Sequence, residues 1–278
     1  MSVMRNPLSA SFGVEALGVD LSGDVSETDA AALRDALKEG LVMVVRDQNL
    51  SPASYIEAMR IFGTPMRQHL SKLLMPEHPE IAVLDSRIAN TKRADGKVMP
   101  IGSRDWHTDH TNHPRPPKMT VLYAVKLPAQ GGDTGFANMQ AAYAALDAAA
   151  QAELDALKTV NSIEQDVGYV DDKARQEFGA PQVHPFIRTH PETGRKAIYV
   201  HPGKLARFEG WDPEASKTFV NDLLGRVLTP EVTYRHKWRP GDLVIWDNRA
   251  LLHVAHTDYD PAEGRILHRL CLEGDVPF

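Results

Sequence analysis

Two periods of hydrophobic and polar residues alternate along this chain, and together they predict a mixture of helices and strands. Apolar residues recur at helical spacing between Ser26, a residue type that caps helix starts, and Gly40, a type that ends helices. Similar signals delimit a second helix between Ser51 and Gly63, with a proline directly after the cap. Two further helices are expected over residues 139–158 and 213–228.

Strands are predicted where short apolar runs are rich in valine, isoleucine, leucine, tyrosine and tryptophan. These runs cover residues 41–45, 81–84, 119–127 and 242–246, and a hairpin turn is expected between 186–188 and 197–200. Residues 86–104 mix polar residues, glycine and proline without a period, so we expect a long loop there. The pattern alone indicates a mixed α/β chain and no particular topology.

Length and composition limit the class of protein. The 278 residues are 42% hydrophobic and 24% charged, enough for a large core, and one domain over 1–278 is expected. The net charge of −6 and the lack of a basic run argue against a nucleic-acid partner. Neither a signal peptide nor a run of about 18 apolar residues is present, so no membrane partner is expected. Cys271 is the single cysteine, which fits a cytoplasmic protein.

The candidate chemistry lies in the run His107-Thr108-Asp109 and in His253, far downstream. Two imidazoles and one carboxylate on one face of a ferrous ion leave three positions for a bidentate cosubstrate and dioxygen. Side chains two residues apart on an extended segment point the same way, so His107 and Asp109 can share a metal while His253 arrives from another strand. Alone the pair says little, because buried histidines often hydrogen-bond to carboxylates.

Further motifs follow this pair in a fixed order along the chain. They are Gly-Gly-Asp-Thr at 131–134, Trp-Asp-Asn-Arg at 246–249 and Arg-Ile-Leu-His-Arg at 265–269. With these motifs the chain, from near residue 10 to its C-terminus, resembles the taurine and 2,4-dichlorophenoxyacetate dioxygenase family of Fe(II)- and 2-oxoglutarate-dependent oxygenases. The resemblance implies a mainly β, mixed α/β fold, with a double-stranded β-helix core of the jelly-roll, cupin-like type and helical insertions.

The resemblance also implies an activity and a set of metal ligands. Fe(II), 2-oxoglutarate and dioxygen would hydroxylate a small organic acid, while 2-oxoglutarate becomes succinate and CO2. His107, Asp109 and His253 match the catalytic metal ligands. His110 is not expected to join them, because a residue three positions along an extended segment faces away. The family pattern leaves three residues between Asp-Asn-Arg and the distal ligand, which selects His253 over His256.

Other matching residues imply the binding of two small acids. Arg265 matches the arginine whose planar fork holds the distal carboxylate of 2-oxoglutarate, and Thr134 matches a hydroxyl that assists it. Arg269 matches the arginine that faces the acidic group of the substrate, a sulfonate, sulfate, aryloxyalkanoate or related carboxylate. His69 lies near where the taurine enzymes place a sulfonate-binding histidine. Family members commonly form dimers or tetramers, so a homo-oligomer is expected.

Two other functions remain open from the residues. A zinc-dependent hydrolase could use the same three ligands with a metal-bound hydroxide, but it leaves Arg265 and Thr134 without a role. A metal-binding, non-catalytic protein of the cupin type is the third possibility. Within the resemblance, the carboxylate of Asp109 favours hydroxylation, since related halogenases have a small residue in its place. The segment from His253 to Arg265 is one residue longer than the taurine enzymes predict, which leaves its loop shape open.

Overall fold

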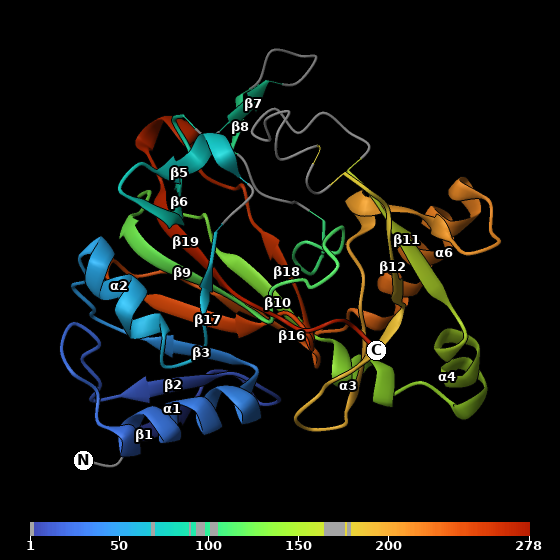
Figure 1. The fold of residues 1–278 in the computed structure, drawn as a ribbon, viewed down its shortest axis with the longest axis horizontal. Helices are drawn as coiled ribbons and strands as arrows, with labels where there is room; N and C mark the ends of the chain where they lie inside the picture. Colours follow the sequence, from blue (N-terminus) through green and yellow to red (C-terminus); the bar gives the residue numbers. More distant parts are fainter. Residues whose placement is uncertain are drawn as a thin grey trace.

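The computed structural model describes residues 3–67, 70–88, 90–92, 98–100, 105–163, 176 and 179–278, and Figure 1 shows its ribbon. Its largest element is a nine-stranded sheet in the order β1-β2-β3-β17-β9-β19-β6-β5, with β4 paired to β19. Neighbouring strands are antiparallel except β2 and β3, which are parallel. The strands are β1 Met4–Pro7, β2 Val14–Leu17, β3 Val42–Val45, β4 Pro65–Met66, β5 Leu74–Met75, β6 His78–Asp85, β9 Met119–Lys126, β17 Leu243–Asp247 and β19 Ile266–Leu272.

A second, three-stranded antiparallel sheet faces the first. It consists of β16 (Thr233–His236), β10 (Thr134–Asn138) and β18 (Leu251–Ala255), in that order. Leu122 and Val244 of the large sheet pack against Phe136 and Leu251 of the small one in a single buried cluster. Two sheets joined through one apolar layer form the sandwich that the jelly-roll prediction requires.

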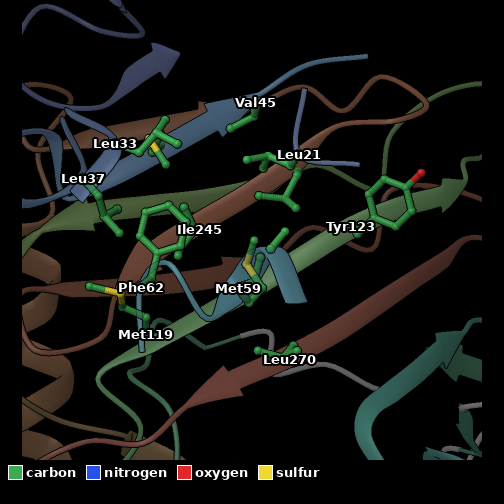
Figure 2. Packing of buried hydrophobic residues seen from close by; sticks show 14 of the residues in the cluster. Leu21, Leu33, Leu37, Val45, Met59, Phe62, Met119, Tyr123, Ile245 and Leu270 are labelled. Atoms are coloured by element: carbon green, nitrogen blue, oxygen red, sulfur yellow. The ribbon is translucent and has the colours of Figure 1, made fainter. Parts of the chain in front are cut away.

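Helices α1 (Glu27–Gly40) and α2 (Pro52–Met59) contribute to the core on the other face of the large sheet. Side chains of β9 alternate between the two faces, because Tyr123 packs with these helices while Leu122 packs toward the small sheet. Figure 2 shows Leu33 and Leu37 of α1 and Met59 of α2 converging on this face. None of the helices in the described ranges combines the length and the apolar content that crossing a bilayer requires.

The remaining elements form a third group, seen at the right of Figure 1. A buried cluster joins α3, α4 and α6 to its strands, and Leu252 of β18 belongs to the same cluster. The elements are α3 Met139–Ala144, α4 Ala148–Asp155, α6 Pro213–Val227, the sheet β12-β11-β15 (Gln182–Pro185, Lys158–Asn161, Leu205–Phe208) and the hairpin β13-β14 (Ile187–Thr189, Lys196–Ile198). Short 3-10 turns lie at Ser71–Leu73, Pro202–Lys204 and Pro261–Glu263.

Most predicted elements are confirmed, and two are wrong in detail. The expected helix over 139–158 is two helices and the start of β11, because the carboxylate of Asp147 accepts a hydrogen bond from the Ala150 amide and begins a new helix. The expected loop over 86–104 contains the paired strands β7 (Asn90–Lys92) and β8 (Val98–Pro100). Strands of three residues are too short to leave a readable period.

Candidate metal centre and cosubstrate site

The two candidate histidines are held together by backbone pairing. The His107 amide donates to the His253 carbonyl at 3.0 Å, and the His253 amide donates to the His107 carbonyl at 2.8 Å. Their ring centroids lie 4.1 Å apart, and the His253 ring lies 4.7 Å from that of Trp246 on β17. His253 therefore extends from the small sheet toward the large one, as the expected origin on another strand requires.

Asp109 completes a cluster whose potential donor atoms all lie within 4.8 Å of one another. Its Oδ1 is 4.0 Å from Nε2 of His107, and its Oδ2 is 3.8 Å from Nε2 of His253. Metal bonds of about 2.1 Å place neighbouring donors about 3 Å apart, so an inward movement of about an ångström would form the site. All three residues are buried, as ligands of an enclosed metal are.

Protonation states at the cluster suit a divalent metal. Burial lowers the pKa of His107, and burial together with the neighbouring His107 lowers the pKa of His253 well below its ordinary value. Burial raises the pKa of the Asp109 carboxyl, but the Arg269 guanidinium and the neighbouring imidazoles together outweigh burial and hold that pKa well below its usual range. Neutral imidazoles and an ionised carboxylate are the ligand forms that Fe(II) binds.

Hydrogen bonds fix how the donors point. The carbonyl of Asp105 lies 2.9 Å from Nδ1 of His107, which favours the tautomer whose Nε2 is free to bind. Thr120 donates to Oδ2 of Asp109 at 2.6 Å, and the Asn248 amide donates to the Thr120 hydroxyl at 2.8 Å. The asparagine of the Trp-Asp-Asn-Arg motif thus orients the carboxylate through a threonine.

Arg269 is 7% exposed and already has an anionic partner. Its Nη2 lies 2.9 Å from Oδ2 of Asp109 and 3.1 Å from Nε2 of His110. Burial of Arg269 therefore does not by itself require the charge of a substrate. Oδ2 of Asp109 accepts from both Thr120 and Arg269, which leaves Oδ1 as the oxygen available to a metal.

Arg265 directly precedes β19, four residues before Arg269, and differs from Arg269 in its partners. It is 9% exposed, and its Nε donates to the carbonyl of Gly132 at 2.9 Å. Its guanidinium lies 5.9 Å from the ring centroid of Trp238 and 6.0 Å from that of Tyr259. No carboxylate in the described ranges forms an ion pair with it, and burial lowers the pKa of Arg265. Such a site is prepared for a carboxylate from outside the chain.

Thr134 and Gly132 support the same arginine. The Trp238 indole donates to the Thr134 hydroxyl at 3.1 Å, so the threonine positions the ring beside Arg265. Gly132 has φ +73°, and a Cβ there would lie 3.0 Å from Cδ of Arg265. Glycine is favoured at this position, because a side chain would be strained at this φ and would crowd the arginine. The Gly-Gly-Asp-Thr motif therefore shapes the place where a 2-oxoglutarate carboxylate would fit.

The competing histidines lie elsewhere. His256 is outside the cluster, and its amide donates to the carbonyl of Asp133. His110 has φ +52° and contacts Arg269, and it is not part of the group of potential metal donors. His69 lies outside the described residues. The sequence analysis missed His201, whose ring centroid is 4.7 Å from that of His107, since no motif or spacing links the two.

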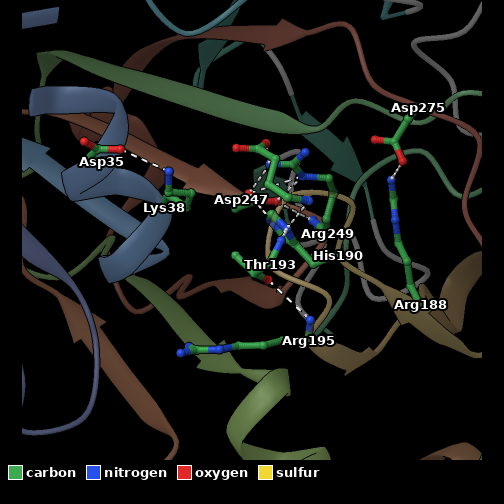
Figure 3. A network of polar contacts seen from close by, with 10 residues as sticks. Asp35, Lys38, Arg188, His190, Thr193, Arg195, Asp247, Arg249 and Asp275 are labelled. Atoms are coloured by element: carbon green, nitrogen blue, oxygen red, sulfur yellow. Dashed lines mark hydrogen bonds and ion pairs between the residues drawn. The ribbon is translucent and has the colours of Figure 1, made fainter. Parts of the chain in front are cut away.

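The charged residues of the Trp-Asp-Asn-Arg motif hold the turn that precedes β18. Figure 3 shows that His190 and Arg249 both contact Asp247. Arg249 donates to Asp247 at 2.6 Å and to Glu192 at 2.9 Å, and Nε2 of His190 lies 3.1 Å from the Asp247 carboxylate. These contacts join the β13-β14 hairpin to the turn. The motif therefore positions the strand that carries His253.

A metal centre held by two imidazoles and one carboxylate has coordination positions left for other ligands. A buried arginine without a carboxylate partner in the described ranges gives such a centre a place for the second carboxylate of a keto acid. This combination of fold and side chains is the one expected of the non-haem Fe(II)- and 2-oxoglutarate-dependent dioxygenase class.

Comparison with known proteins gives the family. The sequence model of the family described as "Taurine catabolism dioxygenase TauD, TfdA family" matches residues 5–271 of this chain. The (S)-phenoxypropionate/alpha-ketoglutarate-dioxygenase of Sphingobium herbicidovorans is 32% identical over 97% of this chain and 94% of that protein. Pentalenolactone F synthase of Streptomyces avermitilis is 31% identical over 100% of this chain and 95% of the relative. The chain belongs to the TauD, TfdA family.

Solved structures confirm the predicted fold. A taurine dioxygenase from Burkholderia xenovorans superposes with a TM-score of 0.82 at 31% identity, over 100% of this chain and 91% of that one. AAD-2, in complex with Mn(II) and N-oxalylglycine, superposes with a TM-score of 0.81 at 26% identity, over 100% and 99% of the two chains.

Proposed function

We propose that this chain uses Fe(II), 2-oxoglutarate and dioxygen to hydroxylate a small organic acid, with release of succinate and CO2. One observation carries the proposal: the cluster of His107, Asp109 and His253 lies in the same sandwich as Arg265, a buried cation with no carboxylate partner in the described ranges. A hydrolytic zinc centre has no need of that cation. A keto acid with a second carboxylate does.

His107, His253 and Oδ1 of Asp109 would hold the metal on one face. When bound, Fe(II) and 2-oxoglutarate together supply the oxidant from dioxygen. Arg269 and Thr120 keep Asp109 ionised and fix its orientation, because both contact Oδ2. We infer that Asp109 binds through one oxygen, which keeps the remaining positions open.

Arg265 would receive the distal carboxylate of 2-oxoglutarate through its Nη nitrogens, since Nε is already used by Gly132. Trp238 and Tyr259 flank the guanidinium and shield that ion pair from water. Thr134 keeps Trp238 in place and would donate its own hydroxyl proton to the same carboxylate. The described residues would thus orient the cosubstrate from both of its ends.

The acidic nature of the substrate is supported by the relatives and by local charge. Relatives are named for their action on (S)-phenoxypropionate, 2,4-dichlorophenoxyacetate and sulfate esters, all of which carry an acidic group. Near the candidate metal, Asp109 is accompanied by the cationic Arg269. A bound Fe(II) adds further positive charge, so an anion is the favoured partner.

The proposal is tested by an anaerobic titration and a turnover screen. Fe(II) and 2-oxoglutarate should produce the charge-transfer absorption band of their chelate, and air should then release succinate with the fitting acid. Arg265→Met should weaken binding of 2-oxoglutarate, while the exposed-residue control Lys217→Met should not. Hydrolysis of one of the organic acids by the protein with Zn(II) in place of Fe(II) would favour the hydrolase. Failure to form the chelate band would favour a non-catalytic protein.

A further inference from the structure

Lys204 is a cation that no motif of the sequence singles out, yet it lies against the loop that carries the metal ligands. It is the last residue of the 3-10 turn Pro202–Lys204 and is half-buried. Its Nζ donates to Oδ1 of Asn112 at 2.5 Å, and Asn112 is 1% exposed. Asn112 follows Asp109 by three residues. The ammonium is therefore fixed against the loop that carries Asp109.

Two further contacts hold this segment in place. The Thr108 amide donates to the carbonyl of Val200 at 3.0 Å, which joins the chain before the turn to the segment between His107 and Asp109. The ring of His201 then lies 4.7 Å from that of His107. Lys204 thus comes from the segment directly before β15, whereas Arg269 lies on β19 of the large sheet.

The charge of Lys204 is less compensated than that of Arg269. Burial lowers the pKa of Lys204 to about 8, the Asp109 carboxylate opposes this shift and the Arg269 guanidinium adds to it. The hydrogen-bond partner of its ammonium is a neutral amide oxygen, and no described carboxylate forms an ion pair with it. Asp109 is instead bound to Arg269. Below a pH of about 8 Lys204 is therefore an ammonium that interacts electrostatically with Asp109 and whose hydrogen-bond partner, Asn112, is neutral.

We propose that Lys204, held by Asn112, binds the acidic group of the primary substrate and so selects organic anions. This inference rests on the proposed function and names a substrate-binding residue for it. An ammonium is a compact point charge that accepts a carboxylate, a sulfonate or a sulfate ester without a fixed planar geometry. Arg269, with Nη2 committed to Asp109 and His110, would act beside Lys204 rather than as the single anchor.

The test uses the Fe(II)- and 2-oxoglutarate-loaded protein without oxygen. Phenoxyacetate, hexyl sulfate and taurine are each titrated with a neutral counterpart, and their binding is followed by the shift of the chelate absorption band and by calorimetry. Lys204→Met should weaken binding of the preferred acid about 10- to 100-fold, as expected for loss of a charge-assisted hydrogen bond. The affinity for 2-oxoglutarate should change less than about threefold, because Arg265 binds it.

Two variants separate charge from structure. Lys204→Arg keeps the charge and should retain most of the affinity. Asn112→Asp keeps the shape of its side chain but places a carboxylate on Lys204, so it should weaken acid binding about as much as Lys204→Met does. Lys217→Met, at an exposed position of α6, is the control for loss of a lysine.

Each outcome decides the inference. Tighter or unchanged binding of the acid in Lys204→Met overturns the inference. The inference is also overturned if the natural protein binds the neutral counterparts more tightly than the acids, or binds none of the compounds. In those cases a persistent chelate band leaves the dioxygenase function standing. Absence of the chelate band in the natural protein refutes the proposed function itself and with it the inference.

Discussion

Replacement of Arg265 by methionine should remove cosubstrate binding without a large loss of stability. Arg265 is buried, lacks a carboxylate partner in the described ranges, and donates from Nε to the carbonyl of Gly132. Methionine keeps most of the apolar stem and removes the charge whose burial is unfavourable in the free protein. The effect of the substitution on the folding stability of the apoprotein therefore depends on two opposing contributions, the lost contacts of the guanidinium and the removal of its buried charge.

The magnitudes follow from these contacts. The variant loses one hydrogen bond, about 1 kcal/mol, and the weak attraction to Trp238 and Tyr259, about 1 kcal/mol. It gains relief from burial of an unpaired charge, which is of similar size or larger. The apoprotein should thus melt within about 4 °C of the natural protein. Loss of the ion pair to 2-oxoglutarate costs about 3 kcal/mol, or more than a hundredfold in affinity.

Calorimetry checks both parts in one experiment. In the natural protein, anaerobic Fe(II) with 2-oxoglutarate at a hundred times its dissociation constant should add about 2.7 kcal/mol of stability, and the same ligand concentrations should add little in Arg265→Met. Thr134→Val should show an intermediate loss. Unchanged 2-oxoglutarate affinity would falsify the role of Arg265. An apoprotein destabilised by more than about 4 kcal/mol would show that the arginine is paired within the chain.

Three further expectations concern the metal centre. Alanine at His107, Asp109 or His253 should abolish succinate release and reduce bound iron below one per chain, whereas His256→Ala should retain both. If His256→Ala lost both properties and His253→Ala kept them, His256 would be the metal ligand instead of His253. Thr120→Val should weaken Fe(II) binding about 10- to 100-fold, measured by competition with a chelator, because Asp109 loses an orienting hydrogen bond. Burial lowers the pKa of His107 and His253, so the unfolded chain takes up protons on these imidazoles that the folded apoprotein does not. The unfolding free energy of the apoprotein should therefore fall as pH drops from about 7 toward 5. Replacing both histidines by glutamine should flatten this pH dependence.

The sequence by itself determined the local structure and the order of the motifs. Helix α1 begins directly after Ser26, because the Ser26 hydroxyl accepts a hydrogen bond from the Asp29 amide. Any fold permits this contact between residues three positions apart. The runs that became β3, β9 and β17 were readable because burial on both faces demands apolar residues. Such signals depend on neighbours in the chain, so spacing alone reveals them.

Tertiary structure decided which charges meet. The pairing of Arg269 with Asp109, and of Lys204 with Asn112, joins residues far apart in the sequence, and neither lysine nor arginine carries a local mark of burial. The division of 139–158 depended on one capping carboxylate, Asp147, within an otherwise helical composition. Charge partners are set by the closure of the two sheets and the backbone contact from Thr108 to Val200, and closure depends on the whole chain.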